Sequence, residues 1–255
     1  MNPEPLVIGV DVGTGSARAG LFTLQGKMLA AATEPIQLWK PKPDYAEQSS
    51  EDIWRAVCKT VRAVVAQAEA PAASVIGIGF DATCSLVVLD AHNRPLPVNE
   101  EGVAERNIIV WMDHRALAET DAINGGEYEV LRYVGGRLSP EMETPKLRWL
   151  KTHLPETWAR AGKFLDLADY LTYRASGVDA RSLCTVVCKW TYLGHERRWD
   201  KAYFRAIGLE DVFEGGKVVE DVRPMGTRLG GLTPEAAGDL GLTTDCAVAV
   251  GSAAR

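Results

Sequence analysis

The N-terminal segment contains two apolar runs joined by a short glycine-rich turn, and this pattern constrains the fold most. The sequence from Leu6 to Phe22 reads LVIGVDVGTGSARAGLF. The first run is rich in β-branched residues and predicts a buried strand, and the second run predicts a strand that pairs with it. A QGK turn at 25–27 then leads to MLAAATEPI, which predicts a third strand at 28–36. The chain is therefore expected to begin with a β-meander.

The turn of this hairpin has the composition of a phosphate site. A P-loop requires a lysine after its glycines, and a dinucleotide loop requires G-x-G-x-x-G at the start of a helix. Neither pattern is present, because no lysine follows and the next element is a strand. What remains is a hairpin tip that carries Asp11, Thr14, Ser16 and Arg18. Glycines allow positive φ and bring N–H groups close to phosphate, and a carboxylate at a strand end can hold hydrated magnesium. A plain hairpin with a polar tip remains the alternative.

The rest of the chain alternates between helical and strand patterns. Ser49 and Ser50 provide caps for a helix that starts with acidic residues and stops before Pro71. The other expected elements are strands at 74–80, 85–90, 181–193 and 246–250, a strand running into a helix at 107–123, and helices at 144–154, 164–177, 201–208 and 233–242. This alternation predicts an α/β fold.

Composition excludes several function classes. The 255 residues are 46% hydrophobic and 24% charged, with a net charge of −6, as in soluble globular proteins. The sequence contains no block of Lys and Arg of the kind that indicates nucleic-acid binding. It also contains no apolar run that approaches the roughly 18–20 residues of a membrane span. The N-terminus does not resemble a secretory signal. The five cysteines are odd in number and lack a C-x-x-C pair, which favours reduced thiols in the cytoplasm and packing roles for Cys184 and Cys188 rather than zinc binding.

The segment GVDVGTGSARAGLF resembles the first phosphate loop of the FGGY carbohydrate kinases, within the sugar kinase, actin and heat-shock ATPase superfamily. The resemblance extends through YAEQSSEDIW, GFDATCSLVVLD, WMDHRA, PKLRWLK, RSLCTVVCKWTY and GLTPEAAGDLGL, which are similar to the D-ribulokinase branch. It implies an FGGY N-terminal domain at residues 1–251. The implied fold is a ribonuclease H-like, actin-like ATPase lobe with a central mixed β-sheet flanked by helices.

The resemblance also implies a reaction and its residues. ATP, with Mg²⁺, would phosphorylate a primary hydroxyl of a ketopentose, and the DATCS segment favours D-ribulose. Asp11 would lie near the metal, and the phosphates would be bound by Asp11, Gly13, Thr14, Gly15, Ser16 and Arg18. The sugar would be bound by Asp81, Thr83, Cys84, Ser85, Asp113 and Lys189. The implied partner is a small sugar, and kinases of this type are often cytoplasmic homodimers.

Each sugar-side residue also has a purely structural interpretation. Asp113 and Arg115 could form a surface ion pair at a helix start. Lys189 could extend its stem along apolar neighbours on a strand and leave its ammonium group in water. Cys84 is at least as typical of a small buried residue as of a ligand contact. Four tryptophans are more typical of a core than of a sugar platform: Trp111, Trp149, Trp190 and Trp199.

The pattern departs from the family at the end of the sequence. The resemblance implies a catalytic aspartate just after the last strand, and Ala254 stands at that expected position. The second, nucleotide-binding lobe is also expected to be absent from this chain. The sequence therefore predicts no catalytic base here and little turnover by the chain alone. The alternative is a non-catalytic sugar- or phosphate-binding module. An actin-like assembly ATPase is disfavoured by the sugar-side segments.

Overall fold

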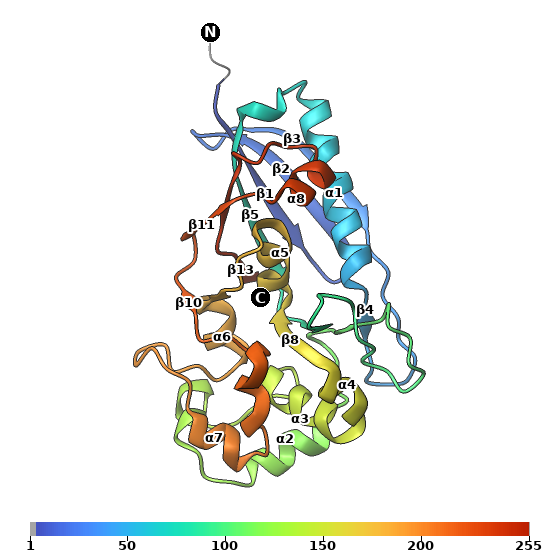
Figure 1. Cartoon of the computed structure of the whole chain (residues 1–255), viewed down its shortest axis with the longest axis vertical. Coiled ribbons are helices and arrows are strands. Elements are labelled where there is room, and N and C mark those ends of the chain that lie inside the picture. Colours follow the sequence, from blue (N-terminus) through green and yellow to red (C-terminus); the bar gives the residue numbers. More distant parts are fainter. Residues whose placement is uncertain (1–3, 255) are drawn as a thin grey trace.

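The computed structural model describes residues 4–254, and its largest element is a seven-stranded mixed sheet in the upper half of Figure 1. In spatial order the strands are β11 (Arg228–Gly231), β12 (Ala247–Ala249), β5 (Val75–Thr83), β1 (Leu6–Val12), β2 (Ser16–Thr23) and β3 (Met28–Pro35), with β13 (Ser252–Ala254) also paired with β5. Strands β1, β2 and β3 form the predicted antiparallel meander, and β5 runs parallel to β1. The mixed α/β architecture predicted from the sequence is confirmed.

Three helices cover one face of this sheet: α1 (Ser50–Gln67), α5 (Leu167–Ser176) and α8 (Pro234–Leu240). Ser49 caps α1 by accepting a hydrogen bond from the Asp52 N–H. Alternate residues of β1, including Ile8 and Val10, are buried with these helices in one apolar cluster. The intervening residues of β1, Val7, Gly9 and Asp11, face the opposite side of the sheet and are half-buried or exposed, so this side is referred to as the uncovered face.

A second, smaller sheet joins the upper half to a helical lower half. Its strands are β4 (Glu47–Gln48), β7 (Ile108–Ile109), β6 (Leu86–Asp90) and β8 (Ala161–Asp166). Val87 and Leu89 belong to the upper apolar cluster, whereas Leu86 and Val88 belong to a second cluster below. Because β6 is buried on both faces, its sequence is a nearly continuous apolar run.

The lower half is built from short helices and turns around the second apolar cluster. Its helices are α2 (Leu117–Asn124), α3 (Glu143–His153), α4 (Pro155–Arg160), α6 (Leu183–Lys189) and α7 (Lys201–Ala206). The remaining elements are the 3₁₀ turns Ala72–Ser74, Glu129–Val134 and Glu210–Gly216 and the paired strands β9 (Arg181–Ser182) and β10 (Val222–Arg223). Among the described residues, no helix is long and apolar enough to cross a membrane.

The strand predicted at 181–193 is wrong, because most of this segment is helix α6. Ser182 caps the helix by accepting from the Cys184 N–H, and Asp169 accepts from both the Ser182 N–H and the Thr185 hydroxyl. These tertiary contacts override the β-branched composition of the segment. The helix predicted at 164–177 is wrong over its first three residues, which pair with β6 before Asp166 caps α5.

Two further details of the backbone differ from expectation. Gly13 and Gly15 do not have positive φ, so the hairpin turn does not need glycine for that reason. The strand predicted at 246–250 is β12, which ends at Ala249, and after Gly251 the chain pairs again with β5 as the unpredicted strand β13. A Cβ at Gly251 would lie 2.7 Å from the Phe80 carbonyl oxygen, so only glycine allows this close approach.

Candidate functional site

A cavity of about 660 Å³ lies where the carboxyl ends of β1 and β5 meet helix α6. Parallel strands bring their carboxyl ends to one edge of a sheet, where ligands of α/β proteins commonly bind. The wall consists of Asp11, Gly13, Thr14, Arg18, Asp81, Thr83, Cys84, Trp111, Glu141, Cys188 and Lys189. The cavity therefore combines residues from the hairpin tip, the β5–β6 turn and the lower half of the molecule.

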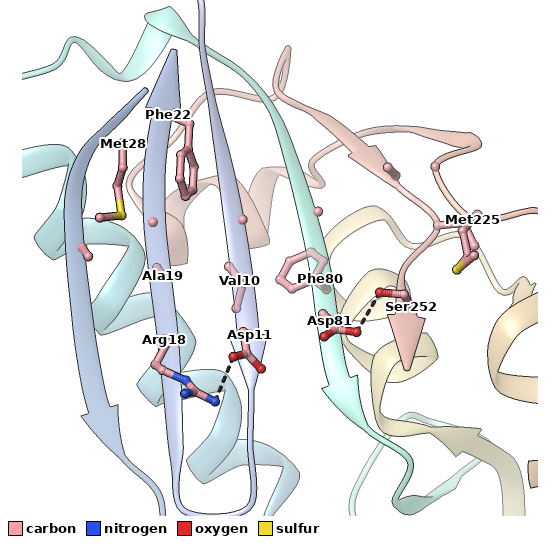
Figure 2. Close-up of a pocket in the computed structure, with 17 residues that line it drawn as sticks. Val10, Asp11, Arg18, Ala19, Phe22, Met28, Phe80, Asp81, Met225 and Ser252 are labelled. Carbon is pink, nitrogen blue, oxygen red and sulfur yellow. Dashed lines mark hydrogen bonds and ion pairs between the residues drawn. The ribbon is translucent and has the colours of Figure 1, made fainter. Parts of the chain in front are cut away.

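Two carboxylates, Asp11 and Asp81, lie side by side on neighbouring strands at one end of the cavity (Figure 2). Asp11 pairs with Arg18 across β1 and β2, with 2.8 Å between Oδ2 and Nη2. Asp81 accepts a hydrogen bond of 2.7 Å from the Ser252 hydroxyl. Both carboxylates keep further lone pairs for a ligand, since each has only one side-chain partner here.

A second hollow of about 670 Å³ continues from these carboxylates along the uncovered face of the large sheet. It shares Asp11, Arg18 and Asp81 with the first cavity. Its floor is made of small residues, including Gly9, which pairs with glycines on both neighbouring strands. Phe22 lies flat against this face, and a Cβ at Gly20 would come within 2.6 Å of its ring. Because these glycines have no side chains, the hollow stays open and the strand backbone stays accessible along it.

The hairpin tip is held by hydrogen bonds from other elements. The Gly13 N–H donates to the Ser16 carbonyl at 3.0 Å, which closes the turn. The Trp111 indole N–H donates to the Thr14 hydroxyl at 2.9 Å, and the Gln48 side chain donates to the Thr14 carbonyl at 2.8 Å. The Thr14 hydroxyl keeps its own proton for a hydrogen bond to an anionic oxygen.

The end of β5 and the β5–β6 turn contribute the neighbouring part of the wall. Thr83 faces the cavity, and its hydroxyl lies 3.5 Å from that of Ser85. Ser85 itself accepts from the Trp111 backbone N–H at 3.1 Å and is fully buried, so it supports the turn rather than lining the cavity. Cys84 is also buried, with 3% exposure, although it forms part of the cavity wall. Its burial agrees with the structural interpretation as a small core residue.

Lys189 extends into the cavity from the last turn of α6, not from a strand. Its Nζ lies 3.9 Å from Oε2 of Glu141, and the other Glu141 oxygen lies 3.4 Å from Nε2 of His114. Glu141 therefore faces cationic or donor groups from two elements. The pair of a lysine and a carboxylate can bind a polyhydroxylated ligand through several hydrogen bonds.

A buried ion pair supports this wall from behind. Lys146 is fully buried, donates to the carbonyls of Trp111 and Glu141 at 3.4 Å each, and lies 3.7 Å from Oε1 of Glu143. Burial raises the pKa of Glu143 to about 7, and burial lowers the pKa of Lys146. The Lys146 side chain thus holds the two carbonyls beside the cavity, which positions Trp111 and Glu141.

The structure does not bring Asp113 to the cavity wall. Its carboxylate is fully buried and accepts from the Ala46 N–H at 2.6 Å, the Arg115 N–H at 2.9 Å and the Arg115 guanidinium at 2.8 and 2.9 Å. Arg115 also pairs with Glu47 at 3.0 Å and stacks over the ring of Tyr45. Asp113 and Arg115 form an ion pair, but it is an interior network and not the surface pair considered from the sequence.

Eight of the twelve sequence-predicted residues therefore line one cavity, and the other four support it or lie elsewhere: Gly15, Ser16, Ser85 and Asp113. Sequence reasoning missed Glu141 and Cys188 and placed Trp111 among core tryptophans. The other three tryptophans are indeed buried in the second apolar cluster. The position of Trp111 directly before the MDHR segment was the available signal. Glu141 offered none, because it lies in an irregular loop before α3.

The residues present fit a hydrated divalent cation bound together with phosphates. Mg²⁺ usually keeps several waters and takes one or two protein carboxylates plus substrate phosphates. Asp11 and Asp81 offer two carboxylates on adjacent strands that face the same space. No cluster of three or more His, Cys, Asp or Glu residues suited to a metal occurs among residues 4–254.

Comparison with known proteins identifies the family. Residues 6–254 match the N-terminal domain of the FGGY family of carbohydrate kinases. A human FGGY carbohydrate kinase domain-containing protein is 52% identical over 251 residues, which are 97% of this chain and 45% of that protein. A D-ribulokinase of Saccharomyces cerevisiae is 43% identical over 259 residues, covering 96% of this chain and 36% of that protein. The crystal structure of a gluconate kinase from Lactobacillus acidophilus shares the fold, with a TM-score of 0.82 at 21% identity over 98% of this chain and 48% of that one.

The chain belongs to the FGGY family of carbohydrate kinases and corresponds to the family's N-terminal domain. It spans about half the length, or less, of the curated relatives it matches. The expected actin-like ATPase lobe is confirmed as well.

Proposed function

We propose that this chain provides the sugar-binding and phosphate-binding half of a pentulose kinase. The complete reaction would transfer the γ-phosphoryl group of ATP to a primary hydroxyl of a ketopentose. One observation carries this proposal: Lys189 and Thr83 line a single cavity together with Asp11 and Thr14. Its volume of about 660 Å³ is in the range of small-molecule sites.

The two ends of the cavity suit different parts of the reaction. At the sugar end, Lys189 donates to sugar oxygens, while Glu141 and the Thr83 hydroxyl accept from sugar hydroxyls. At the phosphate end, the Thr14 hydroxyl and Arg18 donate to phosphate oxygens, and Arg18 adds positive charge. Phosphoryl transfer depends mainly on such positioning and on charge neutralisation, and Mg²⁺ held by Asp11 and Asp81 would supply part of the latter.

No residue of the cavity is assigned as the general base. Asp11 pairs with Arg18, and Asp81 accepts from Ser252. Ala254, which stands where the family's aspartate is expected, pairs in register with Thr83 and so borders the sugar end. A well-placed base typically contributes ~10²–10⁴-fold in rate. We therefore propose that turnover requires residues that in the relatives lie beyond the matched half.

D-ribulose is the favoured sugar because the yeast relative is named a D-ribulokinase. Several bacterial ribulokinases are also similar, one from Geobacillus thermodenitrificans at 31% identity. A cytoplasmic location is part of this proposal, because the five cysteines are sparse and include no C-x-x-C pair. The second candidate function is a binding module without catalysis, which Ala254 favours.

Calorimetric titration of the chain with D-ribulose, together with an assay of ADP release from Mg-ATP, tests the proposal. Sugar binding without ADP release is the expected result. Release of ADP that depends on D-ribulose would mean that a carboxylate within the chain acts as the base. Absence of D-ribulose binding would contradict the assignment of the sugar end.

A further inference from the structure

Two cysteines from separate elements meet in the wall of the cavity. Cys84 lies in the β5–β6 turn and Cys188 in α6, both residues line the same cavity, and their side chains interact. They are far apart in sequence, so this contact depends on the tertiary fold. Lys189, the proposed sugar ligand, directly follows Cys188.

We propose that Cys84 and Cys188 form a reversible disulfide, with glutathione disulfide or a related small-molecule disulfide as oxidant, which closes the sugar end of the cavity. The bond would shorten the sulfur–sulfur separation to about 2.05 Å and draw α6 toward the β5–β6 turn. The effect on sugar binding rests on the proposed function, whereas formation of the bond does not. In reducing compartments, protein disulfides are usually transient and redox-sensing, which fits a reversible modification.

The two thiols differ in access. Cys84 is 3% exposed, whereas Cys188 is only partly buried. Cys188 also lines a separate cavity of about 720 Å³ on the other side of α6, together with Val187 and His195. This second cavity gives a small disulfide a route to Cys188 that does not pass through the sugar site.

The chemistry proceeds in two balanced exchange steps. The Cys188 thiolate attacks one sulfur of glutathione disulfide, forms a mixed disulfide and releases one glutathione thiolate. Cys84 then attacks the Cys188 sulfur, and the second glutathione leaves with the proton that Cys84 gives up. The protein loses two protons and two electrons, and glutathione disulfide is reduced to two thiols.

The environment fixes the order of these steps. The interaction with Cys188, followed by burial, raises the pKa of Cys84. Cys188 is the more accessible of the two thiols and is therefore the first to react.

Cys184 provides an internal comparison because it lies one helical turn before Cys188 on α6. Side chains four residues apart on a helix have Cβ atoms about 5–6 Å apart, whereas a disulfide needs about 3.5–4.5 Å. A bond between Cys184 and Cys188 is therefore strained. Cys246 belongs to the upper apolar cluster, and Cys58 packs against that cluster.

The test is to equilibrate the folded chain with a series of glutathione redox mixtures, trap the thiols by acid and alkylation, and map tryptic peptides. Cys84 is the only cysteine of peptide 63–106, and peptide 182–189 contains both Cys184 and Cys188. The expected product is a cross-link between these two peptides, retained in Cys184→Ser and lost in Cys188→Ser. No cross-link under oxidising mixtures, or an equal cross-link in Cys188→Ser, would overturn the proposal.

Calorimetry with D-ribulose then tests whether the disulfide closes the sugar end of the cavity. Oxidation is expected to weaken binding at least ~10-fold in the unmodified chain, dithiothreitol to restore it, and Cys188→Ser to be insensitive to oxidation. A cross-linked chain that binds D-ribulose as well as the reduced chain would overturn closure of the site. If the reduced chain does not bind D-ribulose, the proposed function fails, while the peptide map still decides whether the disulfide forms.

Discussion

Two Asp–Arg pairs in this molecule have the same contact distance and very different surroundings. Asp11 and Arg18 approach to 2.8 Å with side chains 43% and 53% exposed, whereas Asp113 and Arg115 approach to 2.8 Å with no exposure at all. The first pair borders a cavity and can exchange its partner for a ligand. The second pair is saturated by further hydrogen bonds and holds the protein interior together. Burial, and not residue type, separates binding chemistry from structural chemistry here.

The largest expected effect comes from breaking the interior pair. Arg115→Met would leave Asp113 and Glu47 buried without their main partner, which typically costs about 3–5 kcal/mol. The matched variant Arg18→Met removes an exposed partner and should cost no more than about 1 kcal/mol. Denaturant unfolding of both variants measures the difference. Equal losses would show that the two pairs are not distinguished by burial.

The next-largest effect is expected in the cavity, which the exposed Asp11–Arg18 pair borders. Lys189→Met should weaken D-ribulose binding by roughly 10–100-fold, since a hydrogen bond to a charged group contributes about 1.5–3 kcal/mol. Unfolding stability should change little, because the Lys189–Glu141 contact is long at 3.9 Å. Lys201→Met, which removes an exposed lysine paired with Glu220, is the control. Unchanged sugar affinity in Lys189→Met would remove Lys189 from the site.

A third prediction uses the buried acids behind the cavity. Burial raises the pKa of Glu143 to about 7 and that of Asp169 to about 6, and burial also raises the pKa of Asp166. The folded state therefore binds these protons more tightly than the unfolded state, so this part of the stability is complete below about pH 4 and declines as pH rises toward 7.

Glu143→Gln should reduce the loss of unfolding stability between pH 4 and 7 by up to about 1.4 kcal/mol per pH unit, which is the contribution of one proton. Urea unfolding at several pH values between 4 and 7 measures the slope. The exposed residue Glu220 offers a control, because Glu220→Gln should leave the slope unchanged. A Glu143→Gln chain with the slope of the parent would mean that Glu143 is ionised throughout.

The smallest effect is expected at the hairpin tip. Trp111→Phe removes the indole N–H that donates to the Thr14 hydroxyl, at a cost of about 0.5–1.5 kcal/mol. The loss should be small because the Thr14 side chain can bond water instead. Unfolding experiments measure it, with Trp54→Phe as a comparison, since that indole donates to Asp239 in the upper half. A loss above about 3 kcal/mol would indicate a packing role rather than a hydrogen bond.

The sequence predicted β1, β2, β3, β5 and β12 of the large sheet from their apolar runs and the turn residues between them. It did not predict β11 or β13, which are short and lack such a run. It failed at α6, where Val186 and Val187 suggested a strand and the decisive contacts came from Asp169 on another helix. The cavity residues contributed by the N-terminal hairpin were expected from the composition of the turn and from the family resemblance. The burial of Asp113 was not, because its partner Ala46 and the second partner of Arg115, Glu47, are distant in sequence.

A crystal structure of the chain with D-ribulose would test the central claim most directly. The account predicts the sugar in the cavity between Thr83 and Lys189, with hydroxyls bonded to Glu141 and one primary hydroxyl directed toward Asp11 and Asp81. A sugar bound instead along the uncovered face of the sheet near Gly9 and Phe22, or on the far side of α6, would contradict it.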